Sequence, residues 1–353
     1  MGTWTKASRW LVATGLGVVA GALVLGASGS ALAAKPQPPP PSGKLIYYND
    51  GATSYRMAVD GTGKALLAGT ASGHVSDVRY GGTYWSVWTT WATLPKLPGD
   101  DEDRYRIVAW PVETAGGPIS ILNDASWKVT RPAFRPVAAG SAPKITFSAV
   151  HWTGTTYEAG LYEITLTTDG GGAITGADPT TLTQLIAGSV FTHVTPTQQT
   201  FHWSQLQGHD WLNPTKLVYG NDTFSNGGSL WAQLYLYDFA YPGVPPLALI
   251  AANQPRMVWG PAVNPSGTRV MYGNYTALYE VTTGGNATPT VFVAATSRNR
   301  GTTFDYLDDD WAVYGWQKTT SPFTSDVYRK LRGGSATNLT GDVSASCEPV
   351  AAR

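Results

Sequence analysis

The sequence predicts an all-β fold, a six-bladed β-propeller made of four-stranded antiparallel blades. Two observations predict it. A tyrosine-centred strand segment recurs six times along the chain, and each copy is followed or preceded by further strand-like segments. In addition, only 14% of the residues are charged while Trp, Tyr, Thr and Gly are plentiful, which favours strands over helices. The 353 residues are enough for one large β domain.

The recurring segment is a short strand that in most copies runs into a glycine-rich turn, as in "GLYEITLTTDGG" and "ALYEVTTGG". The six tyrosines are Tyr55, Tyr105, Tyr162, Tyr235, Tyr279 and Tyr328, separated by 50, 57, 73, 44 and 49 residues. Alternation of apolar and polar residues between turn clusters is typical of half-buried strands. A repeat of this length with several strands in each unit indicates a propeller or a similar array.

Three more strands complete each repeat. One precedes each tyrosine, as in "KLIYYND" and "RVMYGNY", and another follows each turn, as in "PISIL" and "VFVAAT". A fourth lies upstream and ends in a turn, most clearly in "RPAFRP" and "WGPAVNPSG". Four antiparallel strands repeated six times are the strand content of a six-bladed propeller.

The first repeat begins at Lys44 without an upstream strand, so its fourth strand has to come from elsewhere. The C-terminal segment "SASCEPVAAR" follows the sixth repeat, and its "CEPV" resembles "RPAF" and "GPAV" of the other upstream strands. We therefore predict that the C-terminal strand completes the first blade. A ring closed in this way leaves no open sheet edge, which a protein with so many strands has to avoid.

The stretches "GPAVNPSGTRVMYGNYTALYEVTTGG" and "RPAFRP…GLYEITLTTDGG" resemble the TolB-like propeller repeat, also described as WD40-like PD40. The resemblance covers residues 44–353 and is best in the third and fifth units; the full turn motif stands only at Asn264-Pro265-Ser266-Gly267. It implies an exported propeller. The resemblance does not imply the role of TolB, because TolB-like proteins have an additional α/β domain for which this chain has no room. We also expect no peptidase domain of the prolyl-oligopeptidase kind after the propeller.

The N-terminus has the parts of a secretory signal peptide. Lys6 and Arg9 precede an apolar run from Trp10 to about Ala27, and small residues in an Ala31-x-Ala33 pattern follow it. The alternative is an uncleaved membrane anchor, because the uncharged stretch is nearly long enough to span a bilayer. We expect cleavage, which divides the chain into a signal peptide at 1–33, a proline-rich linker at 34–43 and the propeller at 44–353. The expected address is the periplasm or the extracellular space.

Composition and motifs exclude several classes of function. With 24 basic and 24 acidic residues the formal net charge is zero, which argues against a nucleic-acid binder. The single cysteine, Cys347, cannot form an intrachain disulfide. The sequence has no G-x-S-x-G nucleophile elbow, phosphate-binding glycine loop or dinucleotide fingerprint. No catalytic constellation stands out, and we expect a monomer.

The stretch "FTHVTPTQQTFHWSQLQGHDWL" is the strongest candidate for a site. Its histidines, His193, His202 and His209, could hold a divalent metal, and metal-bound propellers occur among the oligogalacturonate lyases. Their spacings match no standard zinc pattern, so the alternative is that they lie, hydrogen-bonded, on the innermost strand and its loops. The candidate binding residues of the same stretch are Trp203, Trp211, Gln205 and Asp210, since aromatic faces stack on sugar rings and polar groups orient a partner.

Two acidic runs are weaker candidates. Asp100, Asp101, Glu102 and Asp103 could bind calcium, but their spacing is not that of an EF-hand and a solvated hairpin tip is the favoured interpretation. The run 308–310 occupies the position of the Asn-Pro-Ser-Gly turn in another repeat, so a turn role is expected there.

These observations favour a non-catalytic binding module that needs no cofactor and presents a channel mouth to a protein or polysaccharide of the cell envelope. Loops on a rigid scaffold are where such proteins place recognition. The alternative is a metal-dependent, carbohydrate-active enzyme that resembles the oligogalacturonate lyases.

Overall fold

The computed structural model describes residues 39–351 with short gaps, at 51–52, 68–76, 81–83, 115, 225–229, 253, 255–258, 275–276, 297–298, 319–324 and 342–348. The expected signal peptide, residues 34–38 of the proline-rich linker and Cys347 lie outside the described residues. The described part contains no helix that is long and apolar enough to cross a membrane.

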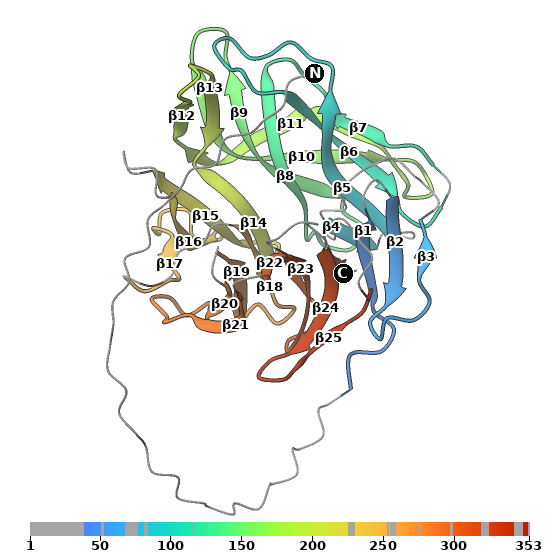
Figure 1. Cartoon of the computed structure of the whole chain (residues 1–353). Helices are drawn as coiled ribbons and strands as arrows, with labels where there is room; N and C mark the ends of the chain where they lie inside the picture. Colours follow the sequence, from blue (N-terminus) through green and yellow to red (C-terminus); the bar gives the residue numbers. More distant parts are fainter. Residues whose placement is uncertain are drawn as a thin grey trace, which may run out of the picture. The chain divides into compact units, whose positions relative to one another are not determined.

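Six four-stranded antiparallel sheets make up the domain, as the sequence predicts, and we number them as blades 1 to 6 along the chain (Figure 1). In each sheet the strands are given from the innermost outward. Blade 1 is β26 (Val350–Ala351), β1 (Leu45–Asp50), β2 (Thr53–Ala58) and β3 (Ala65–Leu66). Blade 2 is β4 (Asp77–Tyr80), β5 (Tyr84–Ala92), β6 (Arg104–Pro111) and β7 (Ile119–Leu122). Blade 3 is β8 (Trp127–Arg135), β9 (Lys144–Trp152), β10 (Tyr157–Thr168) and β11 (Ile174–Gly188).

The second half of the ring has the same organisation. Blade 4 is β14 (Leu206–Asn213), β15 (Lys216–Phe224), β16 (Leu230–Asp238) and β17 (Leu247–Ala248). Blade 5 is β18 (Trp259–Val263), β19 (Arg269–Gly273), β20 (Ala277–Thr282) and β21 (Thr290–Ala294). Blade 6 is β22 (Asn299–Tyr306), β23 (Trp311–Lys318), β24 (Ser325–Leu331) and β25 (Ala336–Asn338).

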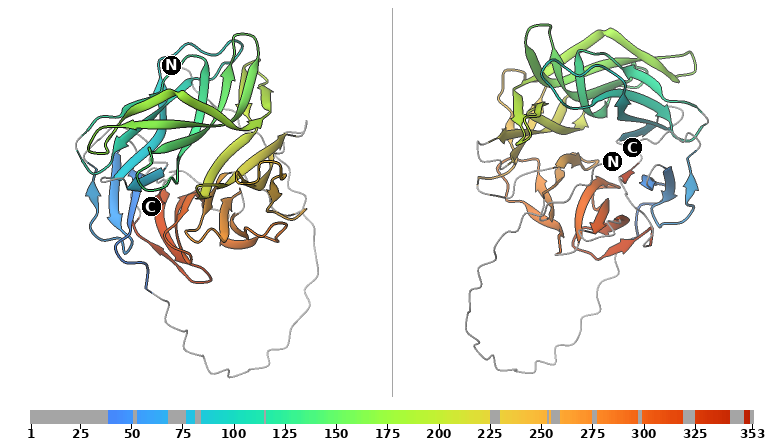
Figure 2. Two further views of the ribbon diagram at one scale, coloured as in Figure 1. Left: turned by 180° about the vertical axis from the view of Figure 1, so that it is seen from behind. Right: turned by 45° about the horizontal axis from the view of Figure 1, so that its top comes forward.

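The innermost strands form a closed ring. Each contacts the next in the order β26, β4, β8, β14, β18 and β22, and β22 contacts β26 again. The blades are therefore arranged around a common axis, and the views in Figure 2 show the sheets following one another around it. This confirms the predicted six-bladed architecture.

The C-terminal strand closes the ring, as predicted. Strand β26 pairs antiparallel with β1, with Ile46 opposite Ala351. The backbone N–H of Ala351 also donates to a carboxylate oxygen of Asp305 in blade 6, at 3.0 Å. The last strand is thus bonded to both the first and the sixth blade, and it joins the two ends of the propeller.

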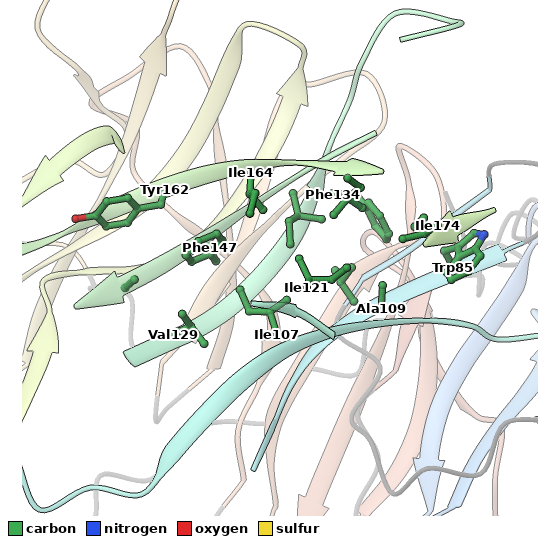
Figure 3. Close-up of a cluster of buried hydrophobic side chains, with 14 of the residues drawn as sticks. Trp85, Ile107, Ala109, Ile121, Val129, Phe134, Phe147, Tyr162, Ile164 and Ile174 are labelled. Carbon is green, nitrogen blue, oxygen red and sulfur yellow. The ribbon is translucent and has the colours of Figure 1, made fainter. Parts of the chain in front are cut away.

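Large apolar side chains between neighbouring sheets form the core. Between blades 2 and 3, Trp85 and Ile107 pack with Phe147, Tyr162 and Ile164, and all five are buried (Figure 3). Successive side chains of a strand point to opposite faces, so the alternate residues Trp88, Val108 and Trp110 lie in a second buried cluster, which contains Tyr47 of blade 1. Trp85, Trp88 and Trp110 of blade 2 are therefore all buried between sheets, as expected from sheet-on-sheet contact.

An additional two-stranded hairpin lies between blades 3 and 4 along the chain. Its strands are β12 (Val190–Val194) and β13 (Thr200–Ser204), which pair with each other and belong to no blade. Its insertion explains why Tyr162 and Tyr235 are 73 residues apart while the other repeats are shorter. From the sequence, this hairpin was not distinguished from the innermost strand that follows it.

Candidate functional site

The inserted hairpin places ring side chains on one of its faces. Phe191 pairs across the hairpin with Trp203, and His193 pairs with Phe201. Residues opposite each other in an antiparallel pair point to the same face, so these four rings share it. We call this set the aromatic face. His193 is exposed, and the other three rings are half-buried.

The four rings of the aromatic face stand nearly parallel. The centroids of His193 and Trp203 are 5.9 Å apart with 10° between the ring planes, and those of Phe201 and Trp203 are 5.9 Å apart with 24° between the planes. Phe191 lies 6.3 Å from Trp203 at 25°. Offset-stacked rings at such separations attract one another, so the aromatic face is pre-arranged rather than a set of independent side chains.

The opposite face of the hairpin packs against blade 3. The ring of His202 lies 4.2 Å from that of Tyr157, and its Nδ1 is 2.9 Å from the hydroxyl of Thr192. Val190 packs against a cluster that contains Val150 and Leu97. Because this face is committed to the propeller, the aromatic face is the one that points away from blade 3.

A buried lysine ties the hairpin to blades 2 and 3. Lys128 of β8 forms an ion pair with Asp100 at 3.1 Å and a second one with Glu102. Its Nζ also donates to the backbone carbonyl of His202 at 2.7 Å. Glu102 in turn accepts a hydrogen bond from Nε1 of Trp203 at 2.7 Å. The position of Trp203 on the aromatic face is therefore fixed by charged groups from two other blades.

The acidic run also covers the free edge of β13. The N–H of Asp101 donates to the carbonyl of Thr200, and the N–H of Thr200 donates to the carboxylate of Asp101, both at 2.7 Å. A loop that pairs in this way protects a strand edge from other chains. The prediction of a solvated hairpin tip was wrong for Asp100, because its side chain is 1% exposed and forms an ion pair with Lys128. Asp101 and Asp103 are exposed.

His209 lies apart from the other two histidines, on β14 of blade 4. Its imidazole is buried, and its Nε2 is 2.7 Å from the hydroxyl of Thr146 in blade 3. The same hydroxyl accepts the Nε1–H of Trp211 at 3.0 Å. Burial lowers the pKa of His209 from 6.5 to about 4; the charge of Arg131 adds to this, whereas Asp210 and the Thr146 bond oppose it.

This lowered pKa predicts acid sensitivity. In the folded chain His209 stays neutral down to about pH 4, whereas in the unfolded chain it takes up a proton below about pH 6.5. The stabilisation is therefore complete above pH 6.5 and is lost as the pH falls towards 4, by up to about 3 kcal/mol. Urea unfolding of wild type and His209→Phe at pH 7, 5.5 and 4 measures it, since the variant lacks this contribution. Parallel pH curves for the two proteins would contradict the assignment.

Asp210 and Trp211 belong to the interior of the ring. One oxygen of Asp210 accepts the N–H of Trp211 at 2.8 Å, and the other accepts the N–H of Val263 in blade 5 at 2.7 Å. In blade 6, Asp305 accepts the N–H groups of Tyr306 and of Ala351 in the C-terminal strand in the same way. The Asp210 side chain therefore links neighbouring blades. Trp211 is 3% exposed and is therefore part of the packed interior.

The three histidines do not gather in one place. His193 and His202 are on opposite faces of the hairpin, and His209 is bonded inside the ring. Within the described ranges no three His, Cys, Asp or Glu side chains are grouped so that they could hold a metal ion. Gln205 lies between β13 and β14, where its N–H donates to the carbonyl of Ser189 at 3.0 Å.

The run 308–310 has the expected turn role. Asp308 accepts the backbone N–H groups of Asp310 and Trp311 at 2.8 and 2.7 Å, which closes the turn between β22 and β23. Asp309 accepts a hydrogen bond from the Asn264 side chain of blade 5 at 2.8 Å. These acidic residues are thus used within the propeller.

Sequence reasoning found two members of the aromatic face, His193 and Trp203, and missed Phe191 and Phe201. The signal was present in "VFTHV" and "TFHWS", two five-residue strands around the turn "TPTQQ". Lys128 was missed as well, because nothing in the sequence connects it with an acidic run in another repeat.

Comparison with known proteins gives likeness of fold only. No protein-family model matches the chain, and no curated protein matches it. The structures that it resembles include the propeller of Dos1, at 10% identity and a TM-score of 0.38, over 86% of this chain and 72% of that one. They also include a putative 6-phosphogluconolactonase from Bacteroides fragilis, at 12% identity and a TM-score of 0.40, over 84% and 80%. A third is the propeller domain of the Trilobed protease from Pyrococcus furiosus, at 12% identity and a TM-score of 0.42, over 86% and 94%.

At identities this low, the substrates, reactions and partners of these proteins cannot be transferred to this chain. Without a matching family model, the TolB-like repeat stays a resemblance in the motifs quoted above. What the chain does has to be argued from its own residues.

Proposed function

We propose that this chain is an exported, non-catalytic binding module and that the aromatic face of the β12–β13 hairpin is its recognition surface. The observation that carries the proposal is the insertion itself. The hairpin belongs to none of the six blades, yet one of its faces holds four ring side chains at the surface of the domain. Aromatic residues at a surface are the side chains that most often anchor a protein partner.

The anchoring of the hairpin supports this function. A recognition surface gains affinity when its groups are ordered before binding, because less conformational entropy is then lost. Lys128, Asp100 and Glu102 order the hairpin from beneath through ion pairs and through the Trp203 hydrogen bond. A buried network of ion pairs is unusual beneath a surface loop that has no binding role.

The spacing of the rings favours a protein over a polysaccharide as the partner. A sugar ring inserted between two aromatic rings needs about 7 Å, twice a van der Waals contact. The rings of His193, Phe201 and Trp203 are 5.9 to 6.5 Å apart and nearly parallel, which leaves too little room for a sugar ring between them. The aromatic face therefore offers a continuous apolar surface, which suits the apolar side chains of a cell-envelope protein.

We expect the double variant Phe191→Ala/Phe201→Ala to lose at least tenfold in partner affinity while its unfolding temperature changes little. Each truncation removes a half-buried anchor, and anchors at the centre of an interface contribute about 2 kcal/mol or more. The measurement is quantitative capture of cell-envelope proteins on immobilised wild type and variant, followed by titration of the captured protein.

The matched control is Val291→Ala, which removes an exposed apolar side chain from the outer strand of blade 5. It should bind like wild type. Equal capture by the double variant would contradict the proposal. Retention of an envelope glycan instead of a protein would move the partner to the polysaccharide class. The export part is tested by recovering the chain outside the cytoplasm with an N-terminus near Ala34.

A further inference from the structure

The β12–β13 hairpin has two outer edges, and the described residues cover only one of them. Along β13, Asp101 pairs with the backbone of Thr200, and Asp100 accepts the N–H of His202. Strand β12, in contrast, pairs with β13 alone. Strand β13 contacts β9, and Figure 1 shows β12 on the side of the hairpin away from β9. An open strand edge is a template on which another strand can pair.

The hydrogen bonds of the turn identify the backbone groups on this open edge. Thr195 donates to the carbonyl of Gln199 at 2.8 Å, so this pair bonds across the hairpin. In an antiparallel ladder, bonded positions alternate with positions whose N–H and C=O groups point away from the partner strand. Counted back from Thr195, the outward positions of β12 are Val190, Thr192 and Val194. Among the described residues, no strand or loop pairs with their backbone groups.

Strand β12 differs from the outer strands of the blades. Strands β3, β17 and β25 have only two or three residues, and β7, β11 and β21 pair with their neighbours through register shifts. Short length and irregular pairing are two means by which proteins keep edge strands from joining other chains. Strand β12 has five residues without a register shift, and it contains no lysine, arginine, acidic residue or proline. Its edge therefore lacks the usual protection.

The sequence of β12, "VFTHV", is nearly symmetric about its central residue, Thr192. When two copies pair antiparallel about Thr192, Val190 lies opposite Val194 of the second copy, and Phe191 lies opposite His193 of the second copy. Pairs of β-branched residues and pairs of aromatic rings are favourable across strands. The outward N–H and C=O groups of each copy then face those of the other copy, and Val194, which is 52% exposed, is covered.

We propose that two copies of this chain pair through their β12 strands, antiparallel and centred on Thr192, so that the two hairpins form one four-stranded sheet. A dimer thus takes the place of the monomer expected from the sequence. Contacts in which the same patch serves both partners are the commonest in homo-oligomers. Residues directly opposite each other point to the same face, so both aromatic faces lie on one side of this sheet. The pairing goes beyond the proposed function and does not depend on it.

The size of the contact sets its expected strength. A contact centred on one strand of five residues is smaller than the ~1,200 Å² at which stable interfaces begin. We therefore expect a reversible dimer that is half formed at roughly 10–100 μM protein.

Sedimentation of the folded protein over a series of concentrations measures the dimer. Thr192→Pro should weaken dimerisation by about tenfold or more, because two symmetry-related N–H donors are lost from the centre of the contact. Proline is tolerated on edge strands, so the variant should fold. Thr192→Val is the control: it loses the same side-chain contact with Nδ1 of His202 but keeps the N–H, and it should dimerise like wild type. Val194→Lys, a second variant, should also dissociate the dimer, since lysine protects edge strands.

Cysteine substitutions test the register, in a chain that also carries Cys347→Ser. Thr192→Cys should give a disulfide-linked dimer on mild oxidation, because Cα atoms that face each other in a bonded pair are about 5.5 Å apart, within disulfide range. Val194→Cys should not, because residues 194 of the two copies are then about 13 Å apart along the strands.

Three results would overturn the proposal: a wild type that stays monomeric at about 1 mM, a Thr192→Pro variant that dimerises as wild type does, and cross-linking at position 194 instead of 192. Protection of the β12 amides from hydrogen exchange only in the presence of a captured envelope protein would assign the edge to a foreign strand and would also overturn it. Thr192→Pro keeps all four rings of the aromatic face, so partner capture and dimerisation are measured separately.

Discussion

A chain truncated after Gly341 is expected to lose most of its stability and to aggregate. Truncation removes β26, so β1 becomes an open edge strand and the carboxylate of Asp305 loses the N–H of Ala351. Asp305 is buried, and the loss of one hydrogen bond to a buried charged group costs about 1.5–3 kcal/mol. The open edge of β1 adds a site at which a second chain can pair.

Thermal unfolding and light scattering measure the effect. The point variant Ala351→Pro tests the same bond without shortening the chain, because proline has no N–H to donate to Asp305 or to the sheet. Removal of residues 352–353 alone is the control and should leave the transition where it is. A truncated chain with the wild-type transition and no aggregation would show that the ring does not depend on its C-terminal strand.

Lys128→Met is expected to destabilise the protein by about 3–5 kcal/mol. The substitution keeps the length of the side chain but leaves Asp100 charged and buried without its ion-pair partner, and removing one partner of a buried ion pair is strongly destabilising. It also removes the bond to the carbonyl of His202, so the hairpin should detach from blade 3. Urea unfolding measures the stability. Limited proteolysis within the turn 195–199 measures the detachment.

Two further variants test whether charge is the cause. Lys128→Met combined with Asp100→Asn should recover part of the loss, because no unpaired charge is then left at position 100. Lys144→Met is the matched control: this lysine is more exposed, and its partner Glu163 keeps a second cation, Arg135. That change should cost less than about 1 kcal/mol. If Lys128→Met cost no more than Lys144→Met, the network would not anchor the hairpin.

The two predictions are linked through binding. If the aromatic face is the recognition surface, Lys128→Met should also weaken partner capture, although Lys128 lies beneath the face. The truncated chain should lose capture only together with its fold. Measuring affinity per folded molecule therefore separates a positioning effect on the hairpin from loss of the propeller.

The sequence by itself determined the architecture. Six copies of a four-strand pattern, together with a first copy that lacks one strand, define six blades and require the C-terminal strand in blade 1. Such information is local, since strand alternation, turn residues and the order of repeats are all readable within a few residues of each other. The turn role of residues 308–310 was predictable for the same reason.

The candidate sites were decided by tertiary structure. In the sequence, the three histidines form one stretch. In the fold, His193 lies on the aromatic face, His202 contacts blade 3 and His209 lies in the inner ring. The acidic run reads as a solvated tip until Lys128 is brought to it from another blade. Each of these sites joins residues from different blades, and the pairing of side chains across blades depends on how the sheets pack, which no local pattern in the sequence encodes.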